Sequence, residues 1–215
     1  TYYLDQESLT GVPSEAWALG GWAGLRSPWW GDVFQLGFVG YTSQKLYGPD
    51  DSDGTRLLRP GQEQITVLGE AFGAVRILGQ TLTGYRQLVN RPFINPRDNR
   101  MVPQTFEAYT LTGSAKDVSY TGGYITKMKL RESDSFTWMS NTAGGTGSQK
   151  GVIYAGGTWD FVKNGYVKMD DQYGVDVFNT FYVEGKYPIA INDRTSLALG
   201  AQYYPQRSVG DEQIG

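Results

Sequence analysis

Apolar and polar side chains alternate every second residue in the second half of this chain. In residues 118–130 the even positions are mostly apolar or aromatic, whereas the odd positions are mostly polar or charged. The same alternation recurs in residues 152–161, 179–191 and 196–204. Because successive side chains of a β-strand point to opposite faces, each segment predicts a strand with one apolar and one polar face.

The connections between the expected strands differ in length in a regular way. About eleven strands are expected, the first ending at residues 2–5 and the others at residues 14–27, 33–44, 65–78, 80–90, 106–116, 118–130, 151–162, 166–178, 179–190 and 196–205. Tight connections alternate with long loops at residues 45–64, 91–105 and 131–150, with one short exception near residue 178. Short turns at one end and long loops at the other are typical of an outer-membrane barrel. We therefore predict an all-β fold, a transmembrane antiparallel β-barrel.

The composition agrees with a barrel and excludes several other classes. No apolar segment approaches the ~20 residues that a membrane helix needs, and the mean hydropathy of -0.41 fits strands that meet lipid with one face only. The chain has no cysteine and no histidine, and therefore lacks thiolate ligands and the commonest general base. A net charge of -3 without a basic stripe argues against nucleic acid as a partner. We expect no catalytic residue, no metal site and no cofactor.

Aromatic residues gather at the ends of the expected strands and in one turn. They are Trp29, Trp30, Trp159, Phe161, Tyr203 and Tyr204. Such side chains suit a girdle at the level of the lipid headgroups, because the ring is apolar while its N–H or O–H needs a polar partner. Core packing in a soluble all-β protein is the alternative for the aromatic residues alone. The alternation and the unequal loops favour the barrel.

One domain is expected over residues 1–215, since no linker separates two regimes of composition. The chain begins without a basic and apolar leader segment and stops in an expected loop at residues 208–215. An odd strand number does not close a bacterial single-chain barrel. We therefore expect a partial chain.

Residues 90–105 differ sharply from the strands around them. Three prolines within twelve residues forbid a central strand, and three arginines with one aspartate make a charged loop. The sequence Arg100-Met101-Val102-Pro103-Gln104-Thr105 resembles the third extracellular loop of the OprD family of substrate-selective outer-membrane porins. A second similarity lies in residues 176–210, with a tyrosine-rich hairpin and a Tyr187-Pro188 turn.

This resemblance implies an eighteen-stranded barrel in the outer membrane of Gram-negative bacteria, of which the chain would supply about the first eleven strands. It implies that residues 91–105 fold into the lumen and narrow the pore. The implied function is passive, selective diffusion of small solutes such as amino acids or carboxylates. The expected partners are outer-membrane lipid and the permeating solutes, and the protein would be a monomer or a loose trimer.

The strand alternation assigns further charged residues to the pore. In residues 65–78, Val67, Gly69, Ala71, Val75 and Ile77 share one face, which leaves Glu70 and Arg76 on the other. Basic groups on the lipid face are costly near the midplane, so inward placement is favoured. The same reasoning turns inward Lys127, Lys129, Asp160 and Lys168. Arg86 shares parity with apolar residues, so a bulge or a position near the strand end is expected there.

Selectivity would follow from charges around the constriction. Arg91, Arg97 and Arg100 offer planar charged groups that bind a carboxylate, while Asp98 with Glu70 and Glu107 could hold an amino group. In the alternative interpretation, the loop arginines pair with loop acids and only fix the loop. For Lys127 and Lys129 the alternative is a solvated strand end.

Two other classes of protein are alternatives to the porin. A soluble or surface β-sandwich, such as a lectin-like ligand-binding protein, would also alternate, and residues 50–54 hint at a calcium loop but lack the distal glutamate of an EF-hand. An enzyme embedded in a barrel is disfavoured, because the chain has neither histidine nor a Gly-x-Ser-x-Gly elbow.

Overall fold

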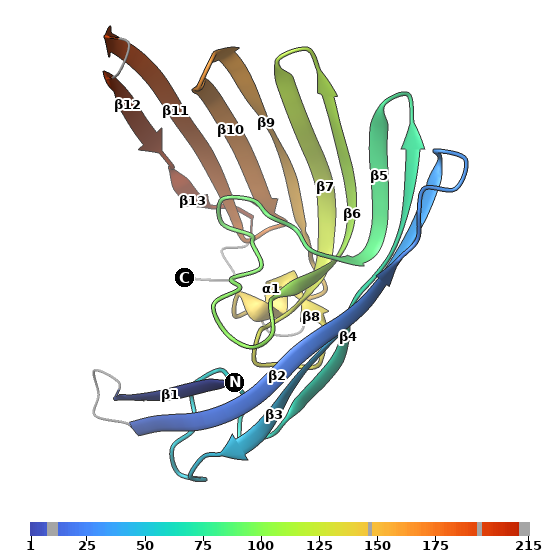
Figure 1. Ribbon diagram of the computed structural model, residues 1–215, viewed down its shortest axis with the longest axis vertical. Helices are drawn as coiled ribbons and strands as arrows, with labels where there is room; N and C mark the ends of the chain where they lie inside the picture. Colours follow the sequence, from blue (N-terminus) through green and yellow to red (C-terminus); the bar gives the residue numbers. More distant parts are fainter. Residues whose placement is uncertain (8–12, 146–147, 193–194, 211–215) are drawn as a thin grey trace. The chain divides into compact units, whose positions relative to one another are not determined.

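The computed structural model describes residues 1–7, 13–145, 148–192 and 195–210. Its strands are β1 (Tyr2–Glu7), β2 (Pro13–Arg26), β3 (Phe34–Tyr47), β4 (Ile65–Ile77), β5 (Gln80–Gln87), β6 (Thr105–Ala115), β7 (Val118–Lys129), β8 (Thr137–Trp138), β9 (Val152–Val162), β10 (Gly165–Gly174), β11 (Phe178–Asn192), β12 (Thr195–Tyr203) and β13 (Gln206–Ser208). One short helix, α1 (Met139–Thr142), is present among these residues. Figure 1 shows the strands in sequence colours.

The expected strands are confirmed, with ends that differ by a few residues. Strands β1 to β7 and β9 to β12 follow one another in the hydrogen-bonded order of the sheet, while β8 pairs with β7 and β13 pairs with β11. The sequence pattern did not predict β8, α1 or β13. The pairs β1–β2, β2–β3, β7–β9, β9–β10, β10–β11 and β11–β12 are antiparallel.

The chain divides into two compact units. Unit 1 comprises Thr1–Ala74, Gly84–Glu107 and Lys127–Thr137, and unit 2 comprises Val75–Thr83, Ala108–Thr126 and Trp138–Gly215. Each unit is described by itself below.

In unit 1, the buried side chains of the strands pack against the long loops. One cluster joins Ala16 and Ala18 of β2 to Leu57 and Leu58 of the loop before β4. A second cluster is formed by Tyr41, Ile65, Val67 and Val102. The core of unit 1 therefore lies between one face of β2 to β4 and the loops, and we call this face the loop face.

The parity expected for β4 is wrong in its first half. The alternation predicts Val67 on the face opposite the pore, yet it is 9% exposed and packs beside Val102 of the loop, whereas Leu68 is 45% exposed. The alternation of burial stops at Gly69, and Gly69 to Phe72 are all buried. A regular period of two therefore does not hold through the strand, and Glu70 is buried together with its neighbours.

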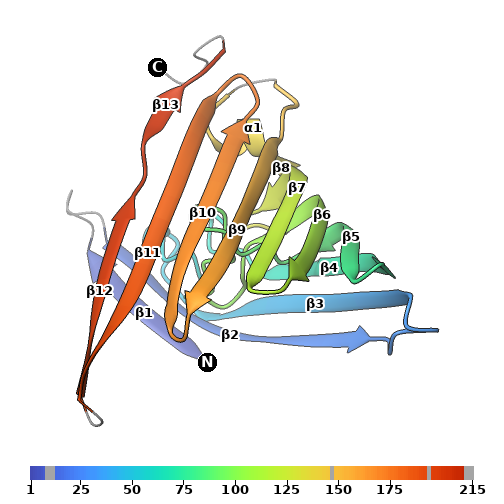
Figure 2. The same cartoon turned by 90° about the horizontal axis from the view of Figure 1, so that it is seen from above.

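In unit 2, strands β9 to β12 lie side by side and are joined by short connections (Figure 2). The alternation expected for β11 is confirmed by burial at residues 180–182, whereas residues 189–192 are exposed at odd and even positions alike. Phe181 is 37% and Ile191 63% exposed, while Thr180 is 4% and Tyr182 8% exposed. The short connection near residue 178 is also observed, where Val177 N–H donates to Gly174 O at 3.0 Å.

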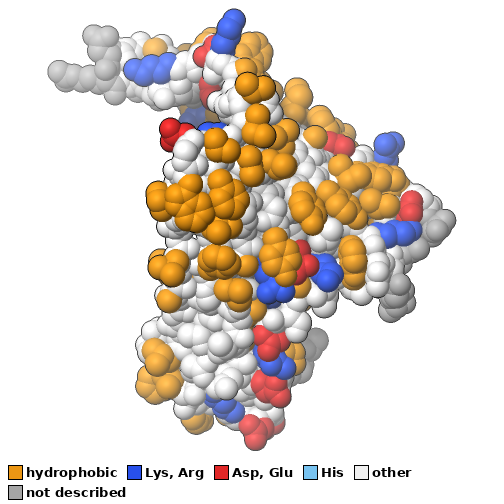
Figure 3. Space-filling model, turned by 90° about the vertical axis from the view of Figure 1, so that its right-hand side faces the viewer, with side chains coloured by type: hydrophobic (Ala, Val, Ile, Leu, Met, Phe, Trp, Pro, Cys, Tyr) orange, Lys and Arg blue, Asp and Glu red, His pale blue; other side chains and the backbone are white. Residues whose placement is uncertain are grey.

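Aromatic side chains stand on the surface at the short-turn ends of strands. Trp159 and Phe161 have ring centroids 5.5 Å apart, and Phe161 stacks on Tyr187 at 6.2 Å. Trp30 packs on Phe34 next to another short turn, with centroids 5.6 Å apart. Figure 3 shows one face of the molecule on which hydrophobic side chains cover much of the surface and charges occur in small groups. Exposed apolar side chains of this kind suit contact with lipid.

Among the described residues, no helix is long and apolar enough to cross a membrane.

Candidate functional site

The loop between β5 and β6, residues 88–104, is seated on the loop face of unit 1. Val102 is 1% exposed in the cluster with Tyr41 and Val67, and Met101 packs against both apolar clusters. A Cβ atom at Gly20 would stand 2.5 Å from Met101 Cε and 2.7 Å from the backbone oxygen of Thr42, so glycine gives Met101 room to pack on β2. Met101 and Val102 therefore fix the loop to the strands.

Hydrogen bonds between its own backbone groups hold the rest of this loop in shape. Arg91 N–H donates to Ile94 O and Gln104 N–H donates to Pro96 O, both at 2.7 Å. Such local bonds satisfy backbone groups that cannot join a sheet ladder near prolines. The side chain of Arg91 is half-buried.

Lys129, expected to face water in the pore, is instead completely buried. Its Nζ atom donates to Pro103 O at 2.8 Å and to Leu130 O at 2.9 Å, and the residue is 0% exposed. The solvated strand end considered as the alternative is wrong as well. Because a buried ammonium group needs acceptors, Lys129 ties the end of the loop to β7.

Arg100 also fixes the loop, through carbonyl groups rather than acids. Its Nε atom donates to Thr55 O at 3.0 Å, and one terminal nitrogen donates to Asn99 O at 2.9 Å. Arg131 donates to the side-chain oxygen of Asn99 from the segment after β7. These bonds join three long loops that lie far apart in the sequence.

Arg131 and Arg56 belong to the same group of charges but were not singled out by the sequence. Arg131 is 8% exposed, and its Nε atom lies 3.8 Å from a carboxylate oxygen of Glu132. Arg56 Nε lies 3.8 Å from the other oxygen of Glu132. Burial lowers the pKa of Arg131, and the positive charges of Arg100, Arg56 and Arg97 lower this pKa further. Four guanidinium groups therefore share one region, which we call the arginine group.

Arg97 is exposed, as is Arg56, whose guanidinium faces Glu132. Its φ angle is +43°, a left-handed conformation that few non-glycine residues adopt. The backbone N–H of Arg97 donates to Asn95 Oδ1 at 3.1 Å, and its carbonyl accepts from Asn99 N–H at 2.8 Å. Local bonds thus support the left-handed turn that carries Arg97 and the exposed Asp98.

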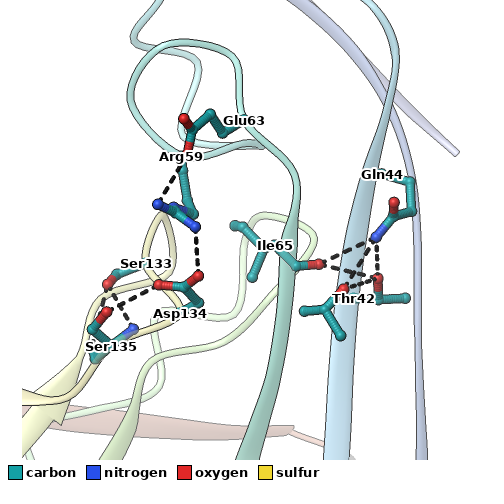
Figure 4. A network of polar contacts seen from close by, with 9 residues as sticks. Thr42, Gln44, Arg59, Glu63, Ile65, Ser133, Asp134 and Ser135 are labelled. Carbon is teal, nitrogen blue, oxygen red and sulfur yellow. Dashed lines mark hydrogen bonds and ion pairs between the residues drawn. The ribbon is translucent and has the colours of Figure 1, made fainter.

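A further arginine ties two long loops together nearby. Arg59 contacts Glu63 at 2.9 Å and Asp134 at 2.5 Å, as Figure 4 shows. On the strands of the same figure, Gln44 Nε2 donates to Thr42 Oγ1 at 2.7 Å. Arg59 is thus held by two carboxylates. The interpretation that loop arginines pair with loop acids describes Arg59 well and Arg97 poorly.

Glu70, Glu107 and Lys127 lie in two other contacts of unit 1. Tyr41 Oη donates to Glu70 Oε1 at 2.6 Å in a buried position. Glu107 accepts from Arg86 Nε at 3.2 Å and lies 3.7 Å from Lys127 Nζ. Both carboxylates are therefore engaged by the protein.

Arg86 alternates in step with apolar residues of its strand, and its place in β5 explains why. Arg86 is the second-to-last residue of β5, so the expected position near the strand end is confirmed. The residue before it, Tyr85, has a φ angle of +83°, a left-handed conformation that few non-glycine residues adopt. The guanidinium of Arg86 lies 4.2 Å from the centre of the Phe136 ring.

Arg76, Asp160 and Lys168 belong to unit 2. Arg76 and Asp160 are exposed, whereas Lys168 is half-buried with Nζ 5.9 Å from the centre of the Tyr182 ring. Tyr182 and Tyr166 both donate to the carboxylate of Glu184. The sequence analysis did not single out Glu184, although its place on the polar face of β11 is evident from the alternation.

The suspected calcium loop is held by its own backbone. The carboxylate of Asp53 accepts from Gly54 N–H and from Gly61 N–H, both at 2.7 Å. Within the part of the chain that the structure describes, no group of three acidic side chains could hold a metal ion.

The fold and the sequence match known proteins. The family model of outer membrane porins of the OprD family matches residues 2–215. A BenF-like porin from Pseudomonas fluorescens Pf-5 has a TM-score of 0.84 at 16% identity, over 99% of this chain and 57% of that one. OccAB2 of Acinetobacter baumannii has a TM-score of 0.85 at 20% identity, over 99% and 57%. OpdK of Pseudomonas aeruginosa has a TM-score of 0.83 at 19% identity, over 99% and 56%.

The chain thus spans little more than half the length of these solved porins. No curated protein matches its sequence. The family match and the antiparallel strands exclude the lectin-like β-sandwich and indicate a channel rather than an enzyme. The protein is located in the bacterial outer membrane, and the chain belongs to the OprD family of outer membrane porins.

Proposed function

We propose that the whole protein is a passive channel for small anionic solutes, such as carboxylates and the carboxylate end of amino acids. The loop at residues 91–105 narrows the pore, and the arginine group attracts the solute there. The observation that carries this proposal is the convergence of loop arginines: Arg100 and Arg131 both donate to Asn99, and Arg131 and Arg56 both lie 3.8 Å from Glu132. Arg97 accepts from Asn99 N–H through its carbonyl group. Planar guanidinium groups bind carboxylates through paired hydrogen bonds.

The members of the arginine group have different roles in this proposal. Arg100 donates a hydrogen bond to Thr55, and Arg131 donates one to Asn99. These two arginines set the position of the loop. Arg97 is exposed, and no described residue accepts a hydrogen bond from its guanidinium. We therefore assign to Arg97 the direct contact with the solute, with Asp98 beside it as the acceptor for an amino group.

The charge balance supports attraction of anions. Four guanidinium groups stand near the carboxylates of Glu132 and Asp98, so an excess of positive charge remains in this region. Of the other expected pore residues, Lys127 and Glu70 have protein partners, while Arg76, Asp160 and Lys168 would line the wall elsewhere. Arg91 would contribute at the entrance to the loop.

The test is the reversal potential of the full-length protein in a planar bilayer under a salt gradient. Removing one charge about 4 Å from a permeating anion changes its energy by about 1 kcal/mol in water, or roughly fivefold. We expect Arg97→Ala to lower the anion-to-cation permeability ratio by about that factor and Arg97→Lys to keep most of it.

A matched control removes a positive charge outside the arginine group. Lys163 is exposed in the short turn between β9 and β10, so Lys163→Ala should leave the ratio unchanged. Equal ratios for Arg97→Ala and the unchanged protein would refute the role of Arg97. The oligomeric state, which we propose to be a monomer or a loose trimer, can be measured from the mass of the detergent-solubilised protein.

A further inference from the structure

The face of unit 1 opposite the loop face is exposed and mostly apolar. In β2 the side chains at odd positions lie on this face, because Ala16 and Ala18 belong to the buried cluster of the loop face. Its large apolar side chains are between 45% and 81% exposed, namely Leu19, Leu25, Phe38 and Leu68. The outward face of a porin strand meets lipid, so we call this the lipid face.

A groove of about 510 Å³ crosses β2, β3 and β4 on the lipid face. Gly21 and Ala23 of β2 line it together with Gly40 of β3. A Cβ atom at Gly21 would meet no atom within 4 Å, and one at Gly40 would meet only carbonyl oxygens at 3.9 Å. The space above these two glycines is therefore open among the described residues.

A polar network lies at the end of this groove nearer the long loops (Figure 4). Gln44 Nε2 donates to Thr42 Oγ1 at 2.7 Å and to Thr66 Oγ1 at 3.2 Å. Thr42 Oγ1 in turn donates to Ile65 O at 3.0 Å. The amide nitrogen of Gln44 is thus engaged, whereas its Oε1 atom accepts no hydrogen bond from a described residue.

The depth of Gln44 in the membrane follows from an aromatic pair above it. Trp17 and Tyr47 pair across β2 and β3 and are 44% and 52% exposed, as suits the level of the lipid headgroups. The pair of Leu19 with Gln44 is the next row on this face, about 7 Å further along the strand. Gln44 therefore lies at the upper edge of the hydrocarbon layer, where an acceptor without a donor is costly.

The lipid face has the length of one leaflet below this point. Gln44 and Phe38 are separated by about 20 Å along β3. At a strand tilt of about 40° this distance covers roughly 15 Å of membrane depth, which is about half of the ~30 Å hydrocarbon core. An acyl chain that begins at Gln44 and follows the groove would therefore end near the middle of the membrane.

We propose that the groove binds one acyl chain of an outer-membrane lipid, from the leaflet on the long-loop side, and that Gln44 Oε1 accepts a hydrogen bond from a hydroxyl group on that chain. The donor belongs to the chain and not to the headgroup linkage, because Gln44 lies below the aromatic pair. The methylene groups cover Gly21, Ala23 and Gly40. This lipid site is separate from the proposed anion channel and does not depend on it.

The experiment measures lipid binding to the full-length porin in detergent by native mass spectrometry. The two probes are dimyristoyl phosphatidylcholine and the same lipid with a β-hydroxyl group on one chain. Neither the choline headgroup nor the ester linkages donate a hydrogen bond, so the probes differ only in the hydroxyl donor. We expect the hydroxylated lipid to bind with a dissociation constant roughly two- to tenfold lower.

Three variants separate the hydrogen bond from the groove. Gln44→Leu should bring the ratio of the two dissociation constants to about one, whereas Gly21→Leu fills the groove and should weaken binding of both lipids. Ala155→Leu is the matched control, because Ala155 is exposed in β9 on the same face as Trp159, outside the groove, and it should change neither constant. Single-channel conductance should be the same in all three variants, which checks that they fold.

Equal affinities of the two lipids for the unchanged protein would refute the role of Gln44, and unchanged lipid binding in Gly21→Leu would refute the groove. A second copy of the chain on this face would appear instead as an oligomer that Gly21→Leu dissociates, and that result would also overturn the proposal. Reversal potentials test the anion channel independently, so the failure of one proposal is distinguishable from the failure of the other.

Discussion

The packing of the loop at residues 88–104 on β2 can be tested by substituting one glycine, Gly20. In Gly20→Ala the new Cβ would stand 2.5 Å from Met101 Cε and 2.7 Å from the backbone oxygen of Thr42. The methionine end can move, but the strand carbonyl cannot. Overpacking of this kind costs about 1–3 kcal/mol. If the loop leaves its seat to relieve the contact, the displaced population rises about five- to 150-fold.

Limited trypsin digestion of the full-length porin in detergent measures that population. Arg97 and Arg100 are the expected cleavage sites, and the initial rate follows the open fraction when opening and closing are fast. Gly21→Ala is the matched control, since a Cβ there meets no atom within 4 Å. We expect faster cleavage in Gly20→Ala and an unchanged rate in Gly21→Ala.

Equal cleavage rates in the two alanine variants would show that Met101 does not hold the loop on β2. A thermal unfolding midpoint that falls in Gly20→Ala without faster cleavage would place the strain in the strand pairing at Thr42 instead.

Two further predictions concern charged groups. Lys129→Met removes a buried ammonium group that donates to Pro103 O and Leu130 O, so we expect a loss of about 1–3 kcal/mol in unfolding free energy. Lys127→Met, with a side chain 33% exposed, should cost less than about 1 kcal/mol, and equal losses in denaturant titrations would contradict the anchoring role of Lys129. Because the chain has no histidine and guanidinium groups stay charged, the anion preference should not change between about pH 6 and 7. A shift in reversal potential over that range would assign the selectivity to another group.

Much of the fold was predictable because strands with two different environments show a period of two. The alternation in β11 predicts Phe181 and Tyr182 on opposite faces, and the exposed Phe181 and buried Tyr182 confirm it. The three prolines and the charged residues of the segment 90–105 also identified the loop. These features depend on local chemistry, which each short segment carries by itself.

The alternation failed where the backbone is irregular or where a loop covers the strand. Tyr85 has a positive φ angle, and no residue type in the sequence marks that position. In β4, Val67 is buried because Val102 of a distant loop packs on it. Burial by a segment far along the chain leaves no periodic signal in the strand that it covers.

The sequence alone therefore determined the positions of the long strands, the short and long connections, the OprD resemblance and the three arginines of the loop. Only the tertiary structure decided which charges meet. It buried Lys129 against Pro103, joined Arg56 and Arg131 to the loop arginines, and left Arg97 exposed. The physical reason is that charge–charge contacts depend on distances in space between loops, and those distances follow from how Met101 and Val102 seat the loop.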